Sequence, residues 1–247
     1  MKMESKLWTP DILAFILAGI LCGSCSSGNV NPEPGSVTVK KCSDFNITGN
    51  GNSSEWSNTG WIEVGTQGSN ISPYGTKVKV LYSDTGLYFL FDCQDTRLTN
   101  TMTADNLNLW EEDVVEVFIW PDESFPVYFE YELSPLDYEL PIIIPNKNGK
   151  FLGWLPWNYY GDKRTRHATS VTGGSKAGGS TVTGWTAEFF IPYRLLSPLV
   201  EGAPESGDKW RANMYRIDYD DGTAYFAWQK TAGSFHEFNR FGTFVFE

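Results

Sequence analysis

Hydrophobic and polar positions alternate with a period of two along residues 114–120, and the rest of the chain is organised around this stretch. One side of the alternation is entirely apolar and consists of Val115, Val117 and Ile119. The other side mixes a carboxylate with apolar and aromatic groups and consists of Val114, Glu116, Phe118 and Trp120. Successive side chains of a β-strand point to opposite faces, so the pattern predicts a strand with one core face and one mixed face. A carboxylate on the mixed face loses solvation unless a hydrogen-bond donor meets it, which makes this face a candidate binding surface.

Similar alternation recurs at short intervals along the chain, separated by turn-forming residues. The predicted strands are 38–47, which is weak, and 76–82, 87–92, 127–133, 166–171, 182–191, 209–218, 224–229 and 241–246. The Gly-rich run 173–179 lies between two of them and predicts a hairpin loop. Only residues 193–196, after Pro192, indicate a helical turn. Many short strands without a long amphipathic helix predict an all-β fold, a single antiparallel β-sandwich of jelly-roll-like type.

The first 24 residues are predicted to be a processing signal rather than part of the fold. Lys2 and Lys6 precede the apolar run 12–22, which is too short to span a bilayer by itself. Small residues then precede Cys25, as in a bacterial lipoprotein signal, so Cys25 is the predicted lipid-bearing first residue of the mature chain. An ordinary secretory signal cut nearby is the alternative. Residues 25–41 then form a lipid-anchored tether, and residues 42–247 form the folded domain.

Composition and charge limit the partners of this domain. The formal net charge is -11, and an acidic surface argues against a nucleic-acid partner. The basic cluster at 163–166 is short and is interpreted as a solvated loop. Beyond the signal only Cys42 and Cys93 remain, too few for a four-thiolate zinc site, and the sequence leaves open whether they pair.

One polar loop is a candidate metal site. A run of turn formers at 49–54 precedes Trp56, and the side-chain oxygens of Asn50 and Asn52 are of the type that Ca²⁺ prefers. The strict spacing of an EF-hand loop is absent, so a polar loop without metal is the competing interpretation. Structural calcium is thus the one candidate cofactor, and no haem is expected.

Five sequence blocks in series carry a resemblance to a known family. They are WEEDVVEVF at 110–118, GWTAE with IP at 184–192, GDKWRAN with YR at 207–216, Trp228, and FH with RFG at 235–242. In their order and spacing they are similar to the family 9 carbohydrate-binding modules and their Bacteroidetes lipoprotein relatives, over roughly residues 42–247. The resemblance implies a β-sandwich in which two aromatic side chains hold a terminal sugar while charged and amide groups bind its hydroxyls.

The resemblance also implies particular ligand contacts in this chain. Trp110 and Trp228 correspond to the aromatic sandwich, and Glu116, six residues after Trp110, corresponds to a hydroxyl acceptor. Asn213 and Arg216 correspond to further polar contacts. Physical chemistry supports such a set, because the C–H face of a pyranose packs on an indole while carboxylate, amide and guanidinium groups serve its hydroxyls. The competing interpretation of each Trp is core packing, which we expect for Trp185 and Trp210.

The leading hypothesis is a non-catalytic, lipid-anchored protein that binds a poly- or oligosaccharide. Its expected place is the cell envelope of a Gram-negative bacterium, at the outer membrane, where it would hold glycan near separate glycoside hydrolases. The membrane contact would run through the lipid on Cys25.

Three alternatives remain open at this stage. A glycoside hydrolase would draw on two of the carboxylates of Glu111, Glu112, Asp113, Glu116, Glu130 and Glu132. A haem-binding sandwich would need axial ligands from Met102, Met214, His167 and His236. A purely structural envelope role would need no ligand site at all.

Overall fold

We describe the fold from a computed structural model, which covers residues 35–147, 150–157, 159–220 and 222–247. The predicted signal, Cys25 and most of the predicted tether lie outside these residues. Within them, no helix is long and apolar enough to cross a membrane.

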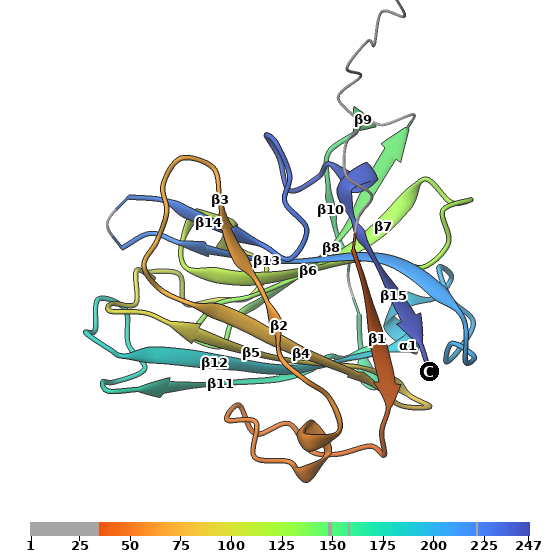
Figure 1. Ribbon diagram of the computed structural model, residues 1–247, viewed down its shortest axis with the longest axis horizontal. Coiled ribbons are helices and arrows are strands. Elements are labelled where there is room, and N and C mark those ends of the chain that lie inside the picture. Colours follow the sequence, from red (N-terminus) through yellow and green to blue (C-terminus); the bar gives the residue numbers. More distant parts are fainter. Residues whose placement is uncertain (1–34, 148–149, 158, 221) are drawn as a thin grey trace, which may run out of the picture. The chain divides into compact units, whose positions relative to one another are not determined.

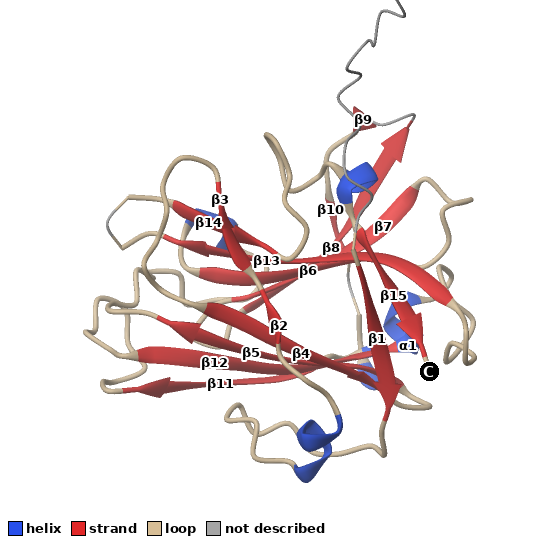
Figure 2. Ribbon diagram, in the orientation of Figure 1, coloured by secondary structure: helices blue, strands red, loops and turns tan. Residues whose placement is uncertain are grey.

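Two β-sheets are packed face to face, as Figures 1 and 2 show. Sheet A has the spatial order β10, β8, β7, β6, β13, β15 and β1, with β14 beside β13, β3 beside β14 and β9 beside β8. Sheet B has the order β1, β4, β5, β12 and β11, with β2 beside β4. The predicted β-sandwich is therefore confirmed.

The bounds of the strands and helices are as follows. The first eight strands are β1 Ser36–Lys41, β2 Ile62–Glu63, β3 Gly65–Gln67, β4 Thr76–Tyr82, β5 Gly86–Gln94, β6 Val114–Trp120, β7 Val127–Leu133 and β8 Glu139–Lys147. The others are β9 Lys150–Phe151, β10 Leu155–Pro156, β11 Arg166–Thr172, β12 Gly184–Pro192, β13 Lys209–Asp218, β14 Ala224–Ala227 and β15 Gly242–Phe246. Short helical turns are η1 Ser54–Asn58, η2 Leu109–Glu111, η3 Gly161–Lys163, α1 Tyr193–Leu196 and η4 Phe238–Arg240.

Strand β1 belongs to both sheets. Its residues 36–39 pair in parallel with β15, and Lys40 and Lys41 pair in parallel with β4. The other pairings between these strands are antiparallel, so the predicted antiparallel sandwich holds except at β1. The sequence predicts a tether over residues 25–41, a range that includes β1. Because its backbone hydrogen-bonds to two strands, the sandwich extends to Ser36 at least.

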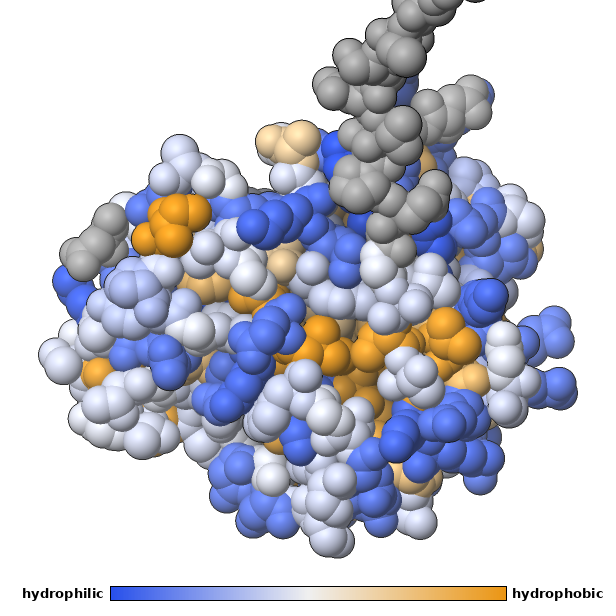
Figure 3. Space-filling view, in the orientation of Figure 1, coloured by the Kyte–Doolittle hydropathy of each residue, from blue (hydrophilic) through white to orange (hydrophobic). Residues whose placement is uncertain are grey.

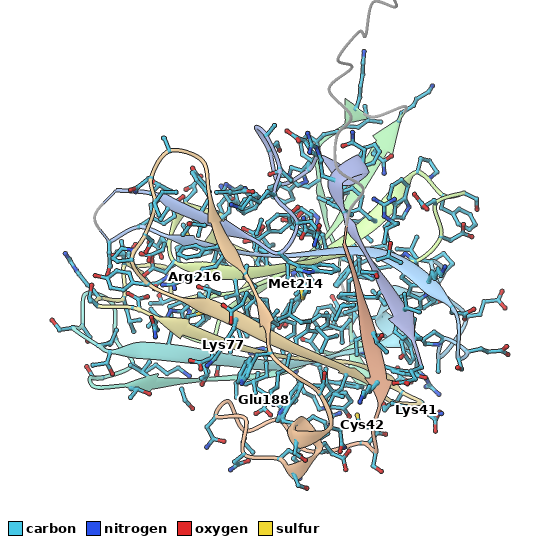
Figure 4. The ribbon with its side chains drawn as sticks, in the orientation of Figure 1. Lys41, Cys42, Lys77, Glu188, Met214 and Arg216 are labelled. Carbon is cyan, nitrogen blue, oxygen red and sulfur yellow. The ribbon has the colours of Figure 1, made fainter. Side chains whose placement is uncertain are left out.

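The core lies between the two sheets and contains the apolar side of β6, as the alternation predicts. Val115, Val117 and Ile119 are fully buried there, and Figure 4 shows Met214 of β13 between the same layers. Trp185 and Trp210 belong to this core, as expected. Burial of these apolar side chains is the main stabilising contribution to the fold.

The outer faces of both sheets are covered as well. Phe118 and Trp120, on the mixed side of β6, form a second buried cluster with Tyr128, Tyr215 and Phe241. A third cluster, on the outer face of sheet B, packs beneath the segment that leads from β1 to η1. The mixed face is thus largely enclosed, so a polar group on it has left bulk water.

The local pattern predicts most of the long strands, but it misses β8 and the short strands β2, β3, β9 and β10. The predicted bounds of β4, β6, β7 and β13 match the structure, and the helical turn at α1 is confirmed. We did not predict β8, which contains Pro141 and Pro145. Proline lacks an N–H for the ladder and normally argues against a central strand. Here β8 lies beside β7 on one side and pairs with β9 and β10 on the other.

The two cysteines of the domain are free. Cys93 is buried in the core between the sheets, whereas Cys42 follows β1 and packs against the cluster on the outer face of sheet B. They therefore form no disulfide with each other in this structure.

The view in Figure 3 shows a mostly hydrophilic surface, with hydrophobic atoms gathered in a band between the two layers. The face in this view is thus mostly solvated, while most of the apolar side chains are held between the sheets.

Candidate functional site

A cavity of about 560 Å³ lies over the outer face of sheet A. Its floor is formed by side chains of β6, β7, β8 and β13, which include Glu116, Phe118, Glu130, Ile142 and Ile217. The walls come from η2, from the segment 151–154 and from the loop between β14 and β15. The predicted residues Trp110 and Glu116 both line this cavity. Its volume lies within the range of small-molecule sites.

Two carboxyl groups on the floor are buried but open toward the cavity. Glu116 is 2% exposed and Glu130 is 4% exposed. Glu116 faces Glu132 directly across the β6–β7 ladder, and Glu130 is opposite Phe118 in the next pair on the same face. Glu116 Oε1 and Glu130 Oε2 accept no hydrogen bond from the residues the structure describes. Like charges directly across a ladder destabilise a sheet, so this cluster is costly unless something else balances it.

Burial changes the protonation of these groups. It raises the pKa of Glu116 to about 8 and, with the negative charge of Glu116, raises the pKa of Glu130 well above its usual range. Nearby His236 has Nδ1 2.7 Å from the hydroxyl of Tyr128 and 3.8 Å from Glu130 Oε2. Burial lowers the pKa of His236 to about 4, so its imidazole is neutral at pH 7. The floor therefore lacks a compensating positive charge from this histidine.

One wall of the cavity is aromatic and is held by η2. The rings of Trp110 and Trp154 meet edge to face at 5.4 Å, and Phe151 stacks on His236 at 4.1 Å. Tyr219 fixes the Trp110 backbone by donating its hydroxyl hydrogen to the carbonyl oxygen at 2.7 Å. This anchoring leaves the indole of Trp110 on the cavity surface.

The opposite wall comes from the loop between β14 and β15. The carboxylate of Glu237 accepts hydrogen bonds from the backbone N–H groups of Ala232, Gly233 and Ser234, which folds the loop over the sheet. Tyr215 donates its hydroxyl hydrogen to Phe235 O at 2.9 Å, and the two rings stack at 4.0 Å. Phe235 and Tyr225 of β14 both line the cavity. Aromatic surface is thus present on this side as well.

Trp228 does not line the cavity, which corrects its predicted place in the aromatic sandwich. Its ring packs against Phe244 with centroids 5.7 Å apart, and it covers Gly242, where a Cβ would approach the indole to 2.4 Å. It lies against the core between the sheets. Tyr225 and Phe235 line the cavity, whereas Trp228 does not.

Asn213 is fully buried and does not line the cavity. It contacts Tyr215 and Gln229, which hold one wall of the cavity in place. Its side-chain oxygen accepts from the Gln229 N–H at 2.9 Å, and its amide group lies 2.6 Å from the Tyr215 hydroxyl. Asn213 therefore fixes the start of the β14–β15 loop and the orientation of Tyr215, rather than facing ligand.

Arg216 points into the space between the sheets, away from the cavity, and Figure 4 shows it there. Its guanidinium donates to Asp95 Oδ2 at 2.9 Å and Asp218 Oδ2 at 3.2 Å and is fully buried. Because β13 side chains alternate, Arg216 lies on the face opposite to Tyr215 and Ile217. The predicted ligand contact of Arg216 is corrected to an internal ion pair.

The loop with Asn50 and Asn52 is organised by a carboxylate of sheet B. Glu188 Oε2 accepts from the backbone N–H groups of Thr48 and Gly49, each at 2.7 Å, and Oε1 accepts from the Trp56 indole at 2.8 Å. Asn50 Oδ1 and Asn52 Oδ1 lie 2.8 and 3.1 Å from Thr48 Oγ1. The donor set is all oxygen, as Ca²⁺ requires, but its one carboxylate already accepts backbone hydrogen bonds. Calcium at Asn50 and Asn52 stays a prediction.

The six carboxylates of the hydrolase alternative divide into groups outside the cavity and groups at its floor. Glu111 is exposed in η2, where it accepts from the Asn108 side-chain amide at 3.2 Å. Glu112 accepts from the N–H groups of Thr101 and Met102, and Asp113 accepts from those of Thr99 and Tyr219, so both fix loops. Glu116 and Glu130 alone line the cavity, while Glu132 is buried beside them.

The haem alternative needs a Met and a His that face one space. Met214 lies between the sheets, whereas His236 lies on the outer face of sheet A. His167 of β11 binds Asp137 at 2.9 Å, and Met102 packs against the outer cluster of sheet A. The structure thus places Met214 apart from both histidines, and the absence of haem stays a prediction.

Several cavity residues were missed from the sequence. Trp154, Phe151, Tyr225 and Phe235 had not been assigned a role in binding, and His236 had been considered only for haem. Most lie in or beside loops with glycine and small residues, such as Gly153 and Gly233. Aromatic residues in such loops are a signal for binding, because loops held by a rigid scaffold often carry function.

The pKa of Glu116 predicts a pH dependence of stability. The folded protein retains a proton on Glu116 up to about pH 8, whereas the unfolded chain loses it near the ordinary value of 4.5. The folded state then binds more protons, so the free energy of unfolding falls as pH rises between these values. We expect Glu116→Gln to remove about 1–3 kcal/mol of that fall. Urea unfolding of the parent protein and of Glu116→Gln at about pH 5 and about pH 8 measures the difference. An equal fall in the free energy of unfolding of the two proteins would contradict the prediction.

The fold and the site together define a class of protein. A β-sandwich that carries an aromatic-walled cavity with hydrogen-bonding carboxyl groups on its floor is a small-ligand binding module, suited to ligands with both apolar faces and hydroxyl groups. The chain belongs to the family described as carbohydrate family 9 binding domain-like, whose family model matches residues 47–247. No protein with a curated description matches the chain significantly.

Solved structures share the fold at low sequence identity. A protein of Bacteroides uniformis ATCC 8492, to which carbohydrate binding has been ascribed, has a TM-score of 0.70 at 16% identity and covers 86% of this chain and 99% of its own. A family 9 carbohydrate-binding module of Caldicellulosiruptor kristjanssonii with glucose has a TM-score of 0.62 at 14% identity, covering 86% and 95%. The same organism's module with cellotriose has a TM-score of 0.60 at 14% identity, covering 86% and 93%.

Proposed function

We propose that this protein binds an oligo- or polysaccharide in the cavity over sheet A and is not an enzyme. The observation that carries the proposal is the cavity itself, with Trp110 and Trp154 on one side, Tyr225 and Phe235 on the other, and Glu116 on the floor. Aromatic faces pack on the C–H groups of a sugar ring, and carboxyl groups bind its hydroxyls. The glucose and cellotriose complexes of the Caldicellulosiruptor modules support this ligand class.

The placement of the carboxyl groups supports binding without catalysis. A glycoside hydrolase places two carboxyl groups on either side of the scissile bond. Glu116 and Glu130 lie on adjacent strands of the same floor, so they approach a bound sugar from one side. Incubation with oligosaccharides followed by product analysis tests this point, and released shorter sugars would contradict it.

Trp110→Ala is expected to weaken saccharide binding at least about tenfold, because it removes an aromatic face from the cavity wall. Calorimetric titration of residues 35–247 with gluco-, xylo- and manno-oligosaccharides measures the change. Trp154→Ala, on the same wall, is expected to act in the same direction.

Trp61→Ala is the matched control for this prediction. Trp61 is an exposed tryptophan beside β2, where Lys77 and Lys79 lie over its ring, and it does not line the cavity. We expect its loss to leave the affinity unchanged. Equal weakening by Trp61→Ala and Trp110→Ala, or none by either, would place saccharide binding elsewhere on the surface.

We further propose that Cys25 carries a lipid that anchors the protein in the cell envelope, at the outer membrane of a Gram-negative bacterium, near separate glycoside hydrolases. The sequence around Cys25 supports the anchor. Expression of the full chain with Cys25 or with Cys25→Ser, followed by membrane fractionation, tests it. Equal membrane association of both forms would remove the anchor from the proposal.

A further inference from the structure

The floor of the cavity concentrates acidic groups without a basic partner. Among the described residues that line it are two carboxyl groups, those of Glu116 and Glu130, and no lysine or arginine. Glu132, buried beside them, adds a third. The buried arginine of the neighbouring strand, Arg216, lies on the opposite face of sheet A and engages Asp95 and Asp218 instead.

Other titratable groups around the floor are neutral. Burial raises the pKa of Tyr128 and Tyr215, and it lowers the pKa of His236 to about 4, so none of the three carries charge at pH 7. Burial and the charges of Glu116 and Glu130 raise the pKa of Glu132 well above its usual range. Without a ligand, burial therefore favours the protonated form of all three carboxyl groups.

Glu116 Oε1 and Glu130 Oε2 define what a ligand should supply. Both atoms are buried, line the cavity and lack a donor among the protein groups the structure describes. A sugar hydroxyl donates one hydrogen and brings no charge. An ammonium group donates up to three hydrogens, and its positive charge stabilises the ionised form of the carboxyl groups. The resulting charge-assisted hydrogen bonds are about twice as strong as neutral ones. Aromatic walls such as Trp110 and Phe235 also attract a cation.

We propose that the cavity selects an aminated saccharide, a sugar that carries a protonated primary amine, over the corresponding neutral sugar. This inference rests on the proposed saccharide site. The amine would donate to Glu116 and Glu130 while the ring packs against the aromatic walls. The carboxyl groups would become ionised when the cation enters, so binding would release protons.

A matched series of three ligands tests the proposal. The β-1,4-linked glucosamine trimer, its N-acetylated form and cellotriose share length and linkage and differ at the C2 substituent, which is charged, neutral amide or hydroxyl. Calorimetric titration at about pH 6 keeps the amine protonated. We expect the glucosamine trimer to bind at least about tenfold more tightly than cellotriose, because it gains a charge-assisted hydrogen bond. Its binding heat should also vary with the ionisation heat of the buffer, which reports proton release.

Two variants show whether the preference arises in the cavity. In Glu130→Gln the advantage of the glucosamine trimer is expected to fall below about threefold, as a charge partner is lost. Glu63→Gln, an exposed change on β2, should keep it. Retention of the full advantage in Glu130→Gln would mean general attraction to the acidic surface and would overturn the proposal.

The three ligands also separate this inference from the proposed function. Cellotriose binding that equals or exceeds glucosamine trimer binding would overturn the selection of an amine and leave saccharide binding intact. Absence of binding by all three to the folded protein would overturn both.

Discussion

Arg216→Met is expected to destabilise the sandwich by about 3–5 kcal/mol, because it leaves two buried carboxylates without their cation. The guanidinium donates to Asp95 and Asp218 and also to the Gln94 carbonyl oxygen at 2.7 Å. Even beside Arg216, burial raises the pKa of Asp95 to about 6. Without the arginine the carboxylates would have to take up protons or draw in water. Denaturant unfolding at pH 7 measures the loss.

Two further variants show whether the loss of stability in Arg216→Met comes from the buried charges. Arg194→Met removes an exposed partner of Asp162 and is expected to cost less than about 1 kcal/mol, as surface ion pairs do. Combining Arg216→Met with Asp95→Asn and Asp218→Asn should recover part of the stability, because the buried charges are removed together. If the triple variant is no more stable than the single one, packing of the arginine rather than charge explains the loss.

Glu188→Ala is expected to cost about 3–5 kcal/mol, because it leaves three N–H donors without an acceptor at about 1–3 kcal/mol each, whereas the Thr48 hydroxyl can still donate to Asn50. The donors are the N–H groups of Thr48 and Gly49 and the indole of Trp56. Glu188 is fully buried under the segment that covers the outer face of sheet B, as Figure 4 shows near its label. Unfolding in denaturant gives the global loss, and hydrogen exchange at the Gly49 amide gives the local one.

Glu188→Gln shows how much of the stabilisation depends on the negative charge, because glutamine has nearly the same shape as glutamate but no charge. Its amide oxygen can still accept, but its NH₂ group faces other donors, so an intermediate loss is expected. Glu63→Ala, on an exposed part of β2, should be close to neutral. A Glu188→Ala protein as stable as the parent would mean that the loop hydrogen bonds contribute nothing to folding.

The sequence predicts the sandwich well because its information is local. Alternation over seven residues defines β6, and the same pattern gives β4, β7 and β13 with their observed bounds. Pro141 and Pro145 prevent the prediction of β8, because the hydrophobic alternation does not show that neighbouring strands accommodate two prolines. The partners of β1 are equally hidden, because nothing local to Ser36 indicates which distant strand it meets.

The site was predictable only where it coincides with local signals. Trp110 lies in η2 just before β6, Glu116 lies on the mixed face of β6, and both line the cavity. Trp228 and Arg216 are residue types that suit a sugar site equally well, but tertiary packing directs both toward the interior. No local pattern reveals that Arg216 forms a buried ion pair with Asp95, which is distant in sequence. The face a side chain occupies is decided by the whole sheet.

The double pairing of β1 has a consequence for the time course of synthesis. Ser36 to Val39 pair with β15, the last strand of the sandwich, so the domain cannot close before residues 242–246 have been synthesised. Contacts between distant segments also form slowly, because the chain loses the entropy of loop closure before these contacts can stabilise it. The nascent chain would therefore keep β1 without its sheet A partner until β15 has been made.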